Sequence, residues 1–227
     1  ENPRILQDCD LKDSGMSVLV VGGAGYIGSH TVRSLEAAGE DVWVLDNLSK
    51  GHAEAVRPDR LIQADLENPG DLHAALADHR IESVIHFAAH ASVPESVADP
   101  AICYRNNVVG TLNLLDAMRS TGVRRIVFSS TCAVYGIPKS SPIDESFPKA
   151  PINPYGYTKL VIETTLSDYA KAYGIGYAAL RYFNACGASA DGRIGEDHTP
   201  ETHLIPLTLQ VALGQRDNLS IFGTDYP

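Results

Sequence analysis

Tyr155, Lys159 and Thr131 are the residues whose types and spacing point most directly to chemistry. Tyr155 and Lys159 form a Y-x-x-x-K pattern, which places both side chains on one face of a helix. A free tyrosine has a pKa of about 10, and a nearby lysine ammonium favours the phenolate and lowers that value. The pair is therefore predicted to act as a general base near neutral pH. An ordinary surface pair shows the same spacing, so the interpretation needs a third member.

Thr131 supplies that member. It lies in the segment Ser129–Gly136 (SSTCAVYG), directly after a predicted strand. Ligands of open α/β folds bind at the carboxyl ends of the strands, where this hydroxyl could bond a substrate hydroxyl and pass its proton to Tyr155. The alternative is that the hydroxyls of this segment only cap the strand end.

A glycine-rich turn, Gly22–Gly28 (GGAGYIG), follows the first predicted strand and opens the first predicted helix. Gly22, Gly25 and Gly28 allow a tight turn, the approach of a pyrophosphate to the backbone, and close packing of the helix. The helix N-terminus then presents free N–H groups to the phosphates. Asp46 ends the second predicted strand, where a carboxylate suits a ribose 2′-hydroxyl and repels a 2′-phosphate. The cofactor is therefore predicted to be NAD and not NADP.

Two further strand ends are candidates for cofactor contact. Asp65 follows the third predicted strand and could reach an adenine amino group, or it could cap the following turn. Phe87 is followed by two small residues, Ala88 and Ala89, which would let a ligand lie against the backbone. Close helix packing is the alternative explanation for these alanines.

The elements that must position these residues alternate between strands and helices. Short apolar runs predict strands at Ser17–Val21, Asp41–Leu45, Leu61–Ala64, Ser83–Phe87, Arg125–Ser129 and Gly176–Arg181. Helical spacing predicts helices at Tyr26–Ala38, Asp71–Asp78, Ala101–Thr121 and Pro154–Tyr173, the last capped by Asn153. Alternating elements of this kind predict an α/β fold with a Rossmann-type, doubly wound parallel sheet.

Three regions are expected along the chain. Residues 1–15 are polar and are interpreted as an N-terminal extension. Residues 16–184 form the predicted NAD-binding Rossmann domain. The strand–helix rhythm weakens afterwards, so residues 185–227 are interpreted as the start of a smaller substrate-binding domain that continues beyond this sequence.

Composition excludes several classes of partner. The net charge of −10 repels nucleic acids and anionic membranes. No apolar run approaches the roughly 20 residues of a transmembrane helix, and residues 1–15 lack the features of a secretory signal. None of the four cysteines forms a C-x-x-C pair or has zinc-site spacing with histidines, so we expect free thiols, a cytoplasmic protein and no metal site.

Taken in order, the motifs resemble those of the extended short-chain dehydrogenase/reductase family, and within it the UDP-glucose 4-epimerases. The resemblance runs from about Met16 to Pro227. It rests on the glycine turn, Asp46, the SSTCAVYG and YGYTK segments and Arg181–Asn184 (RYFN). It implies NAD-dependent interconversion of UDP-glucose and UDP-galactose by transient oxidation at sugar C4. It also implies a homodimer formed through helices 101–121 and 154–173.

The resemblance assigns roles by position. Thr131, Tyr155 and Lys159 would be the catalytic set. The contacts to NAD would come from Gly22, Gly25, Tyr26, Ile27, Gly28, Asp46, Asn47, Asp65, Leu66, Phe87, Ala88, Ala89, Asn106, Tyr155, Lys159 and Phe183. The UDP-sugar would be held by Thr131, Asn184, His203, Leu204, Ser220, Ile221 and Phe222.

The sequence also departs from the family pattern. Relatives usually carry serine at the position of Thr131, and some carry a lysine within the stretch occupied here by His90–Ser92. A nucleotide-sugar 4,6-dehydratase is one alternative, but those enzymes carry acidic residues where this chain has Cys132 and Ala133. A non-catalytic NAD-binding regulator is the other, since a fold does not determine a function.

Overall fold

Six parallel strands form one sheet in the order β3-β2-β1-β4-β5-β6 in the computed structural model, which describes residues 16–221 and 223–224. The strands are β1 (Ser17–Val21), β2 (Asp41–Asp46), β3 (Leu61–Gln63), β4 (Ser83–His86), β5 (Arg125–Ser129) and β6 (Gly176–Leu180). This order confirms the predicted doubly wound parallel sheet. Three predicted strands end one residue too late, because Ala64, Phe87 and Arg181 already lie beyond the sheet's carboxyl edge.

Strand β1 shows why the sheet is buried on both faces. Leu19 and Val21 belong to one hydrophobic cluster, and Val18 and Val20 belong to the other. Alternate residues of a strand point to opposite faces, so a continuous apolar run fills two cores at once. The central position of β1 places the turn that follows it in the middle of the sheet's carboxyl edge.

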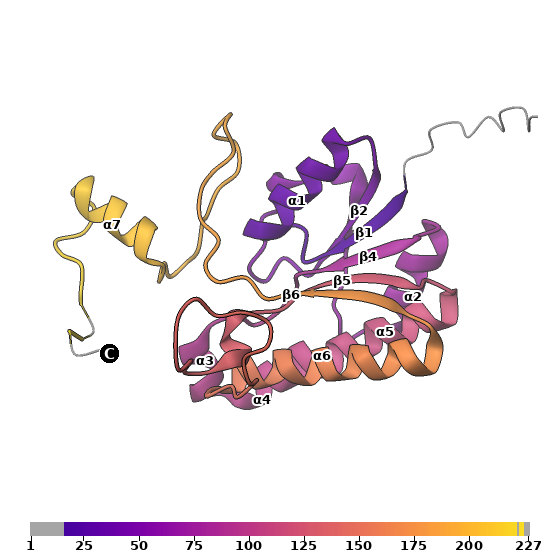
Figure 1. The fold of residues 1–227 in the computed structure, drawn as a ribbon. Coiled ribbons are helices and arrows are strands. Elements are labelled where there is room, and N and C mark those ends of the chain that lie inside the picture. Colours follow the sequence, from indigo (N-terminus) through magenta and orange to yellow (C-terminus); the bar gives the residue numbers. More distant parts are fainter. Residues whose placement is uncertain (1–15, 222, 225–227) are drawn as a thin grey trace, which may run out of the picture.

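Helices cover both faces of this sheet (Figure 1). One face carries α1 (Tyr26–Ala37), and the other carries α2 (Pro69–Asp78), α5 (Gly110–Thr121) and α6 (Pro154–Tyr173). The remaining short turns are η1 (Ala53–Ala55), η2 (Pro58–Arg60) and η4 (Cys132–Tyr135). The start of α6 follows the prediction, because Asn153 accepts a hydrogen bond from the Gly156 N–H at 2.8 Å and Pro154 occupies the first turn.

The regular helix predicted for residues 101–121 is corrected by the structure. It consists of α4 (Pro100–Tyr104), the π-helical turn η3 (Arg105–Val109) and α5. The π turn places the side chain of Asn107 in the interior, where it is 1% exposed. Two further helices, α3 (Val93–Ala98) and α7 (Leu204–Ala212), were not predicted.

The chain after β6 extends away from the sheet (Figure 1). The Tyr26 hydroxyl donates to the Gly187 carbonyl at 2.8 Å, and Arg33 pairs with Asp191. Helix α7 follows, and none of its residues is buried. Within the described part of the chain, no helix has both the length and the apolar character to cross a membrane. The predicted extension, residues 1–15, lies outside the described residues.

Candidate active site

The glycine turn between β1 and α1 packs too tightly for side chains at two positions. Gly22 has φ of +80°, and a Cβ there would lie 2.5 Å from the Ala88 backbone nitrogen. A Cβ on Gly28 would lie 2.2 Å from the Gly22 carbonyl oxygen. The turn therefore requires glycine at both positions. Ala88, one of the predicted small residues after β4, lies directly against this turn.

The N-terminus of α1 is left open by this turn. Gly25 is its N-cap residue, no side chain caps it, and no acidic residue lies in its first turn. The first N–H groups of a helix have no partner within the helix and carry a partial positive charge. The start of α1 at Tyr26 and Ile27 therefore offers the kind of N–H groups that a phosphate would need.

Asp46 lies beside the same turn and is held in place by the backbone. Its two carboxylate oxygens accept hydrogen bonds from the Ala24 N–H at 3.0 Å and from the Leu48 N–H at 2.9 Å. The residue is 7% exposed. Each carboxylate oxygen has a further lone pair, so Asp46 retains acceptor capacity for a ribose hydroxyl.

The next predicted cofactor contacts form a pair at the ends of β2 and β3. The Asn47 amide donates to one Asp65 carboxylate oxygen at 2.8 Å, and the other oxygen accepts from the Glu67 N–H at 2.8 Å. Asp65 therefore caps the following turn, and it also lies just beyond the carboxyl end of β3, where the cofactor contact was predicted. Leu66 is buried and packs closely against Gly110 of α5. Phe87 and Ala89 are half-buried after β4.

Thr131 and Tyr155 approach each other because α6 begins close to η4. A Cβ on Gly156 would lie 2.8 Å from the Ala133 carbonyl oxygen, so glycine permits this approach. The Thr131 hydroxyl accepts from the Ala133 N–H at 3.1 Å, which is the capping role considered from sequence. A hydroxyl also has a proton to donate and a second lone pair. The same side chain lies near enough to Tyr155 to lower its pKa, so the capping role does not exclude the predicted catalytic one.

Lys159 lies on the predicted face of α6 but in an apolar setting. It is 2% exposed, and its ammonium group donates to the Ser129 carbonyl oxygen at 2.8 Å. Its Nζ lies 4.8 Å from the Phe128 ring centroid and 5.8 Å from that of Tyr155. Burial lowers the pKa of Lys159 from 10.5 to about 7.

The expected lowering of the Tyr155 pKa is wrong for the structure without a ligand. Burial raises the pKa of Tyr155 from 10.0 to about 12, and the nearby Thr131 side chain offsets only part of this effect. Burial disfavours both the phenolate and the ammonium, so it raises the pKa of Tyr155 and lowers the pKa of Lys159. The resting state of the pair is a neutral phenol beside a lysine that titrates near neutral pH.

Lys159→Met is expected to raise the free energy of unfolding of the cofactor-free protein at about pH 6. Below pH 7 the native wild type must bury an ammonium group. Between about pH 7 and 10.5 the unfolded chain holds a proton that the native protein has released, so wild-type stability rises with pH. The advantage of the variant, at most about 5 kcal/mol, therefore shrinks across this window. Urea unfolding over this pH range measures it.

Lys171→Met is the matched control, because Lys171 is an exposed lysine on the same helix. We expect its difference from wild type to stay constant with pH. An equally constant difference for Lys159→Met would contradict the assignment of Lys159 as a buried titrating group.

Asn107 is a site residue that sequence reasoning missed. Its amide oxygen accepts from the His90 N–H at 2.8 Å, and its amide nitrogen donates to the His90 carbonyl at 3.1 Å and to the Thr158 hydroxyl at 3.1 Å. It therefore links the loop after β4 to helix α6, which carries Tyr155 and Lys159. Its neighbour Asn106, the predicted NAD contact, is half-buried and donates to Asn107 at 2.9 Å. A polar pair within an otherwise helical pattern was the available signal.

A buried ion pair beneath the catalytic set was also missed. Glu163, 5% exposed by side chain, accepts two hydrogen bonds from Arg181 at 2.7 Å each and one from Ser130 at 2.6 Å. Arg181 also donates to the Tyr135 hydroxyl at 2.7 Å. Burial raises the pKa of Glu163, but its bonds to Arg181 and Ser130 and the charges of Arg181 and Lys149 outweigh this and hold it below the ordinary value.

Among the predicted nucleotide-sugar residues, Thr131 lies near Tyr155, whereas the others follow β6. Asn184 and the predicted NAD contact Phe183 are exposed just after β6, and Leu204 is exposed at the start of α7, which stands apart from the sheet (Figure 1). Ser220 and Ile221 are also exposed. His203 faces a separate cluster of glutamates and a histidine. Phe222 lies outside the described residues.

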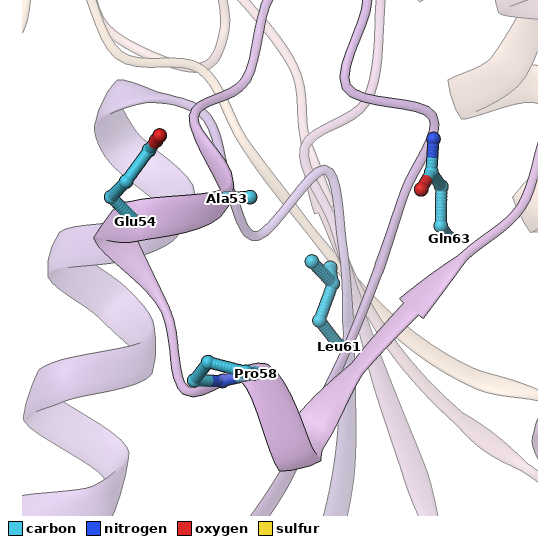
Figure 2. A pocket seen from close by; sticks show the side chains of 5 residues that line it. All are labelled: Ala53, Glu54, Pro58, Leu61 and Gln63. Carbon is cyan, nitrogen blue, oxygen red and sulfur yellow. The ribbon is translucent and has the colours of Figure 1, made fainter.

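Two cavities lie on the α1 side of the glycine turn. Figure 2 shows one of about 310 Å³ beside the edge strand β3, lined by Ala53, Glu54, Pro58, Leu61 and Gln63. None of these residues belongs to the predicted site. The other, of about 250 Å³, lies between the start of α1 and residues 193–198. Its walls include Gly25, Tyr26, Lys50, Arg193 and His198.

Comparisons with known proteins agree with this arrangement. The chain is 55% identical over 211 residues to the UDP-glucose 4-epimerase of Halalkalibacterium halodurans, a match covering 93% of this chain and 63% of that protein. It resembles the structure of Brucella ovis UDP-glucose 4-epimerase in complex with NAD, with a TM-score of 0.90, 52% identity, and coverage of 93% and 65% of the two chains. For Bifidobacterium longum UDP-glucose 4-epimerase in complex with NAD⁺ and UDP, the TM-score is 0.87 at 36% identity, with coverage of 93% and 66%.

The matches cover most of this chain but only part of each relative. The chain spans less than two thirds of the length of the first curated relatives it matches, 63% in the case above. The sequence model of the NAD dependent epimerase/dehydratase family matches residues 18–226, which is nearly the whole chain. The open helix N-terminus, the carboxylate beside it and the tyrosine–lysine pair all lie within this range. The chain therefore belongs to the NAD dependent epimerase/dehydratase family.

Proposed function

We propose that this chain carries the cofactor and catalytic residues of a UDP-glucose 4-epimerase, which interconverts UDP-glucose and UDP-galactose. The observation that carries the proposal is the grouping of Thr131, Tyr155 and Lys159 at the carboxyl end of β5, in a chain about half identical to named epimerases. The catalytic roles and the epimerase activity are both part of this proposal.

NAD is the proposed cofactor, and three features support its fit. The uncapped N-terminus of α1 would hold the pyrophosphate, with Gly22 and Gly28 giving access to the backbone. The Asp46 carboxylate would accept a ribose hydroxyl and would repel the 2′-phosphate of NADP. When bound, NAD supplies a group that takes up a hydride and can return it.

The catalytic residues would move one proton. Once ionised, the Tyr155 phenolate oxygen would take the proton of the sugar 4-hydroxyl in the forward direction, and the resulting phenol would give it back in reverse. Thr131 would hold the phenol oxygen through its hydroxyl, and Lys159 would supply positive charge beside the ring. Because burial raises the Tyr155 pKa to about 12, this charge and that of the bound cofactor must stabilise the phenolate.

The nucleotide sugar would be held by the region after β6. Asn184, His203, Leu204, Ser220, Ile221 and Phe222 are the proposed contacts. The boundary at residue 184, between the Rossmann domain and the substrate-binding region, is proposed with them. The exposed position of α7 is compatible with this role, because a surface that receives a ligand must be accessible.

A homodimer is the proposed assembly. Ile102 and Tyr104 of α4 and Tyr157 and Val161 of α6 are apolar or aromatic and are 40–50% exposed. Apolar side chains of this kind on neighbouring helices favour burial against a partner.

A cytoplasmic location is proposed as well, supported by free thiols at Cys103, Cys132 and Cys186.

The dehydratase alternative requires a proton donor for the sugar 6-hydroxyl. The residues after Thr131 are Cys132 and Ala133, and burial raises the pKa of the Cys132 thiol. A thiol with a raised pKa is a poorer proton donor than a carboxylic acid. The geometry therefore favours return of the hydride to C4 over elimination.

The fate of a C4 label tests this proposal in the intact protein. UDP-glucose deuterated at C4 is expected to give UDP-galactose with deuterium still at C4, because no other exit for the hydride is available. A 4-keto-6-deoxy product would reject the epimerase in favour of a dehydratase. Loss of the C4 label to solvent would contradict hydride return within one active site. UDP-glucose deuterated at C5 is the control, since only elimination breaks that bond.

A further inference from the structure

Four side chains away from the proposed catalytic residues converge on one point. Glu196, His198, Glu201 and His203 lie in the segment that leads into α7, and each offers one ligand atom within 4.8 Å of the others. Two are carboxylates and two are imidazoles. All four are ligand types that zinc and similar ions accept.

The two carboxylates of this cluster need a positive partner. The side chains of Glu196 and Glu201 are only 9% and 8% exposed. Within the described residues, their ion pairs are with His198 and His203 alone, and no lysine or arginine lies within 4.0 Å. Two buried carboxylates side by side are costly unless a cation lies between them. A divalent ion with two neutral histidines would make the cluster electrically neutral.

The distances around His198 match coordination better than hydrogen bonding. Its Nδ1 atom is buried and has no hydrogen-bond partner. It lies 3.6 Å from a Glu196 oxygen and 3.7 Å from a Glu201 oxygen, which is too long for a hydrogen bond. Two ligand atoms about 2.1 Å from a tetrahedral ion lie about 3.4 Å apart. The His203 Nδ1 atom lies 3.7 Å from the other Glu201 oxygen and hydrogen-bonds to Glu196, and coordination of an ion would replace this hydrogen bond.

We infer that Glu196, His198, Glu201 and His203 bind a divalent transition-metal ion of the zinc class. Four protein ligands around one ion leave no open position, so the site is structural and not catalytic. The backbone N–H groups of Thr202 and His203 donate to a Glu201 oxygen at 2.7 and 2.9 Å, which orients that ligand. The ion would fasten the start of α7, where His203 is the N-cap residue, to the preceding loop.

This inference departs from the sequence expectation of no metal site. That expectation considered the cysteines and their spacing to histidines, whereas this cluster contains no cysteine. Its evidence does not rest on the proposed epimerase activity, although the two share His203. If both hold, metal binding occupies the His203 imidazole, and only its backbone remains for the nucleotide sugar.

Metal uptake by the purified protein tests the inference. The protein is treated with a chelator, dialysed and titrated with Zn²⁺ by calorimetry, and its metal content is then measured. We expect one zinc ion per chain in wild type and in His73→Ala, whose exposed histidine lies on α2. His198→Ala and the conservative Glu201→Gln are expected to weaken binding by more than about 100-fold, beyond the effect of losing an outer-shell partner. Circular dichroism confirms that each variant is folded.

Cobalt substitution distinguishes this site from a thiol site. Co²⁺ is expected to give the visible absorption of a tetrahedral ion without a sulfur-to-cobalt band. Unchanged binding in both His198→Ala and Glu201→Gln would overturn the inference, as would a sulfur band abolished by Cys186→Ser. Absence of zinc uptake by folded wild type would also overturn it, and would leave two histidines paired with two glutamates.

Discussion

Tyr155→Phe is expected to lower the turnover of UDP-galactose by about 10²–10⁴-fold, the usual contribution of general acid–base catalysis. The substitution keeps the aromatic ring and removes the oxygen that would accept the proton of the sugar 4-hydroxyl. The Tyr155 side chain is half-buried, so water has limited access to the place of the lost oxygen. Turnover and the Michaelis constant are measured separately in the intact protein, and the loss is expected in turnover.

Tyr157→Phe is the matched control for this experiment. Tyr157 lies two residues further along α6 and is 49% exposed, so its hydroxyl is expected to contribute little to turnover. Near-normal turnover in Tyr155→Phe would show that Tyr155 is not the base. Equal losses in the two variants would instead indicate a general effect on α6.

Glu163→Ala is expected to lower the free energy of unfolding by about 3–5 kcal/mol, the typical cost of removing one partner from a buried ion pair. The variant leaves the Arg181 guanidinium without its two strong hydrogen bonds and the Ser130 hydroxyl without its acceptor. Arg181 is itself 17% exposed by side chain, so water replaces these bonds only in part. Urea denaturation near neutral pH measures the loss.

Asp168→Ala is the control for Glu163→Ala, because Asp168 is an exposed acid on the same helix. Its effect is expected to stay within about 0.5 kcal/mol, as for other surface sites. A similarly small effect for Glu163→Ala would refute the structural role of the buried pair.

Glu163 lies four residues after Lys159, and Ser130 immediately precedes Thr131. For this reason, Glu163→Gln is expected to reduce turnover even where the protein remains folded.

Much of the architecture follows from local sequence patterns. The bounds of β1, β5 and α6 agree with the predicted Ser17–Val21, Arg125–Ser129 and Pro154–Tyr173. Apolar runs, the glycines that follow β1 and α6, and the Asn153 cap act within a few residues of one another, so a single segment contains the signal. The glycine turn is a local feature too, although the contact between Gly22 and Ala88 explains why it is needed.

The sequence was a weaker guide where a distant partner shapes the backbone. The π turn at Arg105–Val109 depends on Asn107 reaching both His90 and Thr158, which lie on other elements. The short helix α3 contributes to the site because the Ser96 hydroxyl accepts a hydrogen bond from the Tyr155 N–H at 3.2 Å. Neither contact leaves a periodic pattern in the chain.

The residue types and spacing of Tyr155, Lys159 and Thr131 were sufficient to predict a catalytic set, whose role remains a proposal. Only the tertiary structure decided the protonation of that set. The spacing predicted a lowered Tyr155 pKa, whereas burial raises it to about 12 and lowers that of Lys159 to about 7. Desolvation depends on every atom that surrounds a group, and here those atoms come from several strands and helices. The Glu163–Arg181 pair has the same origin, since folding alone brings together charges 18 residues apart.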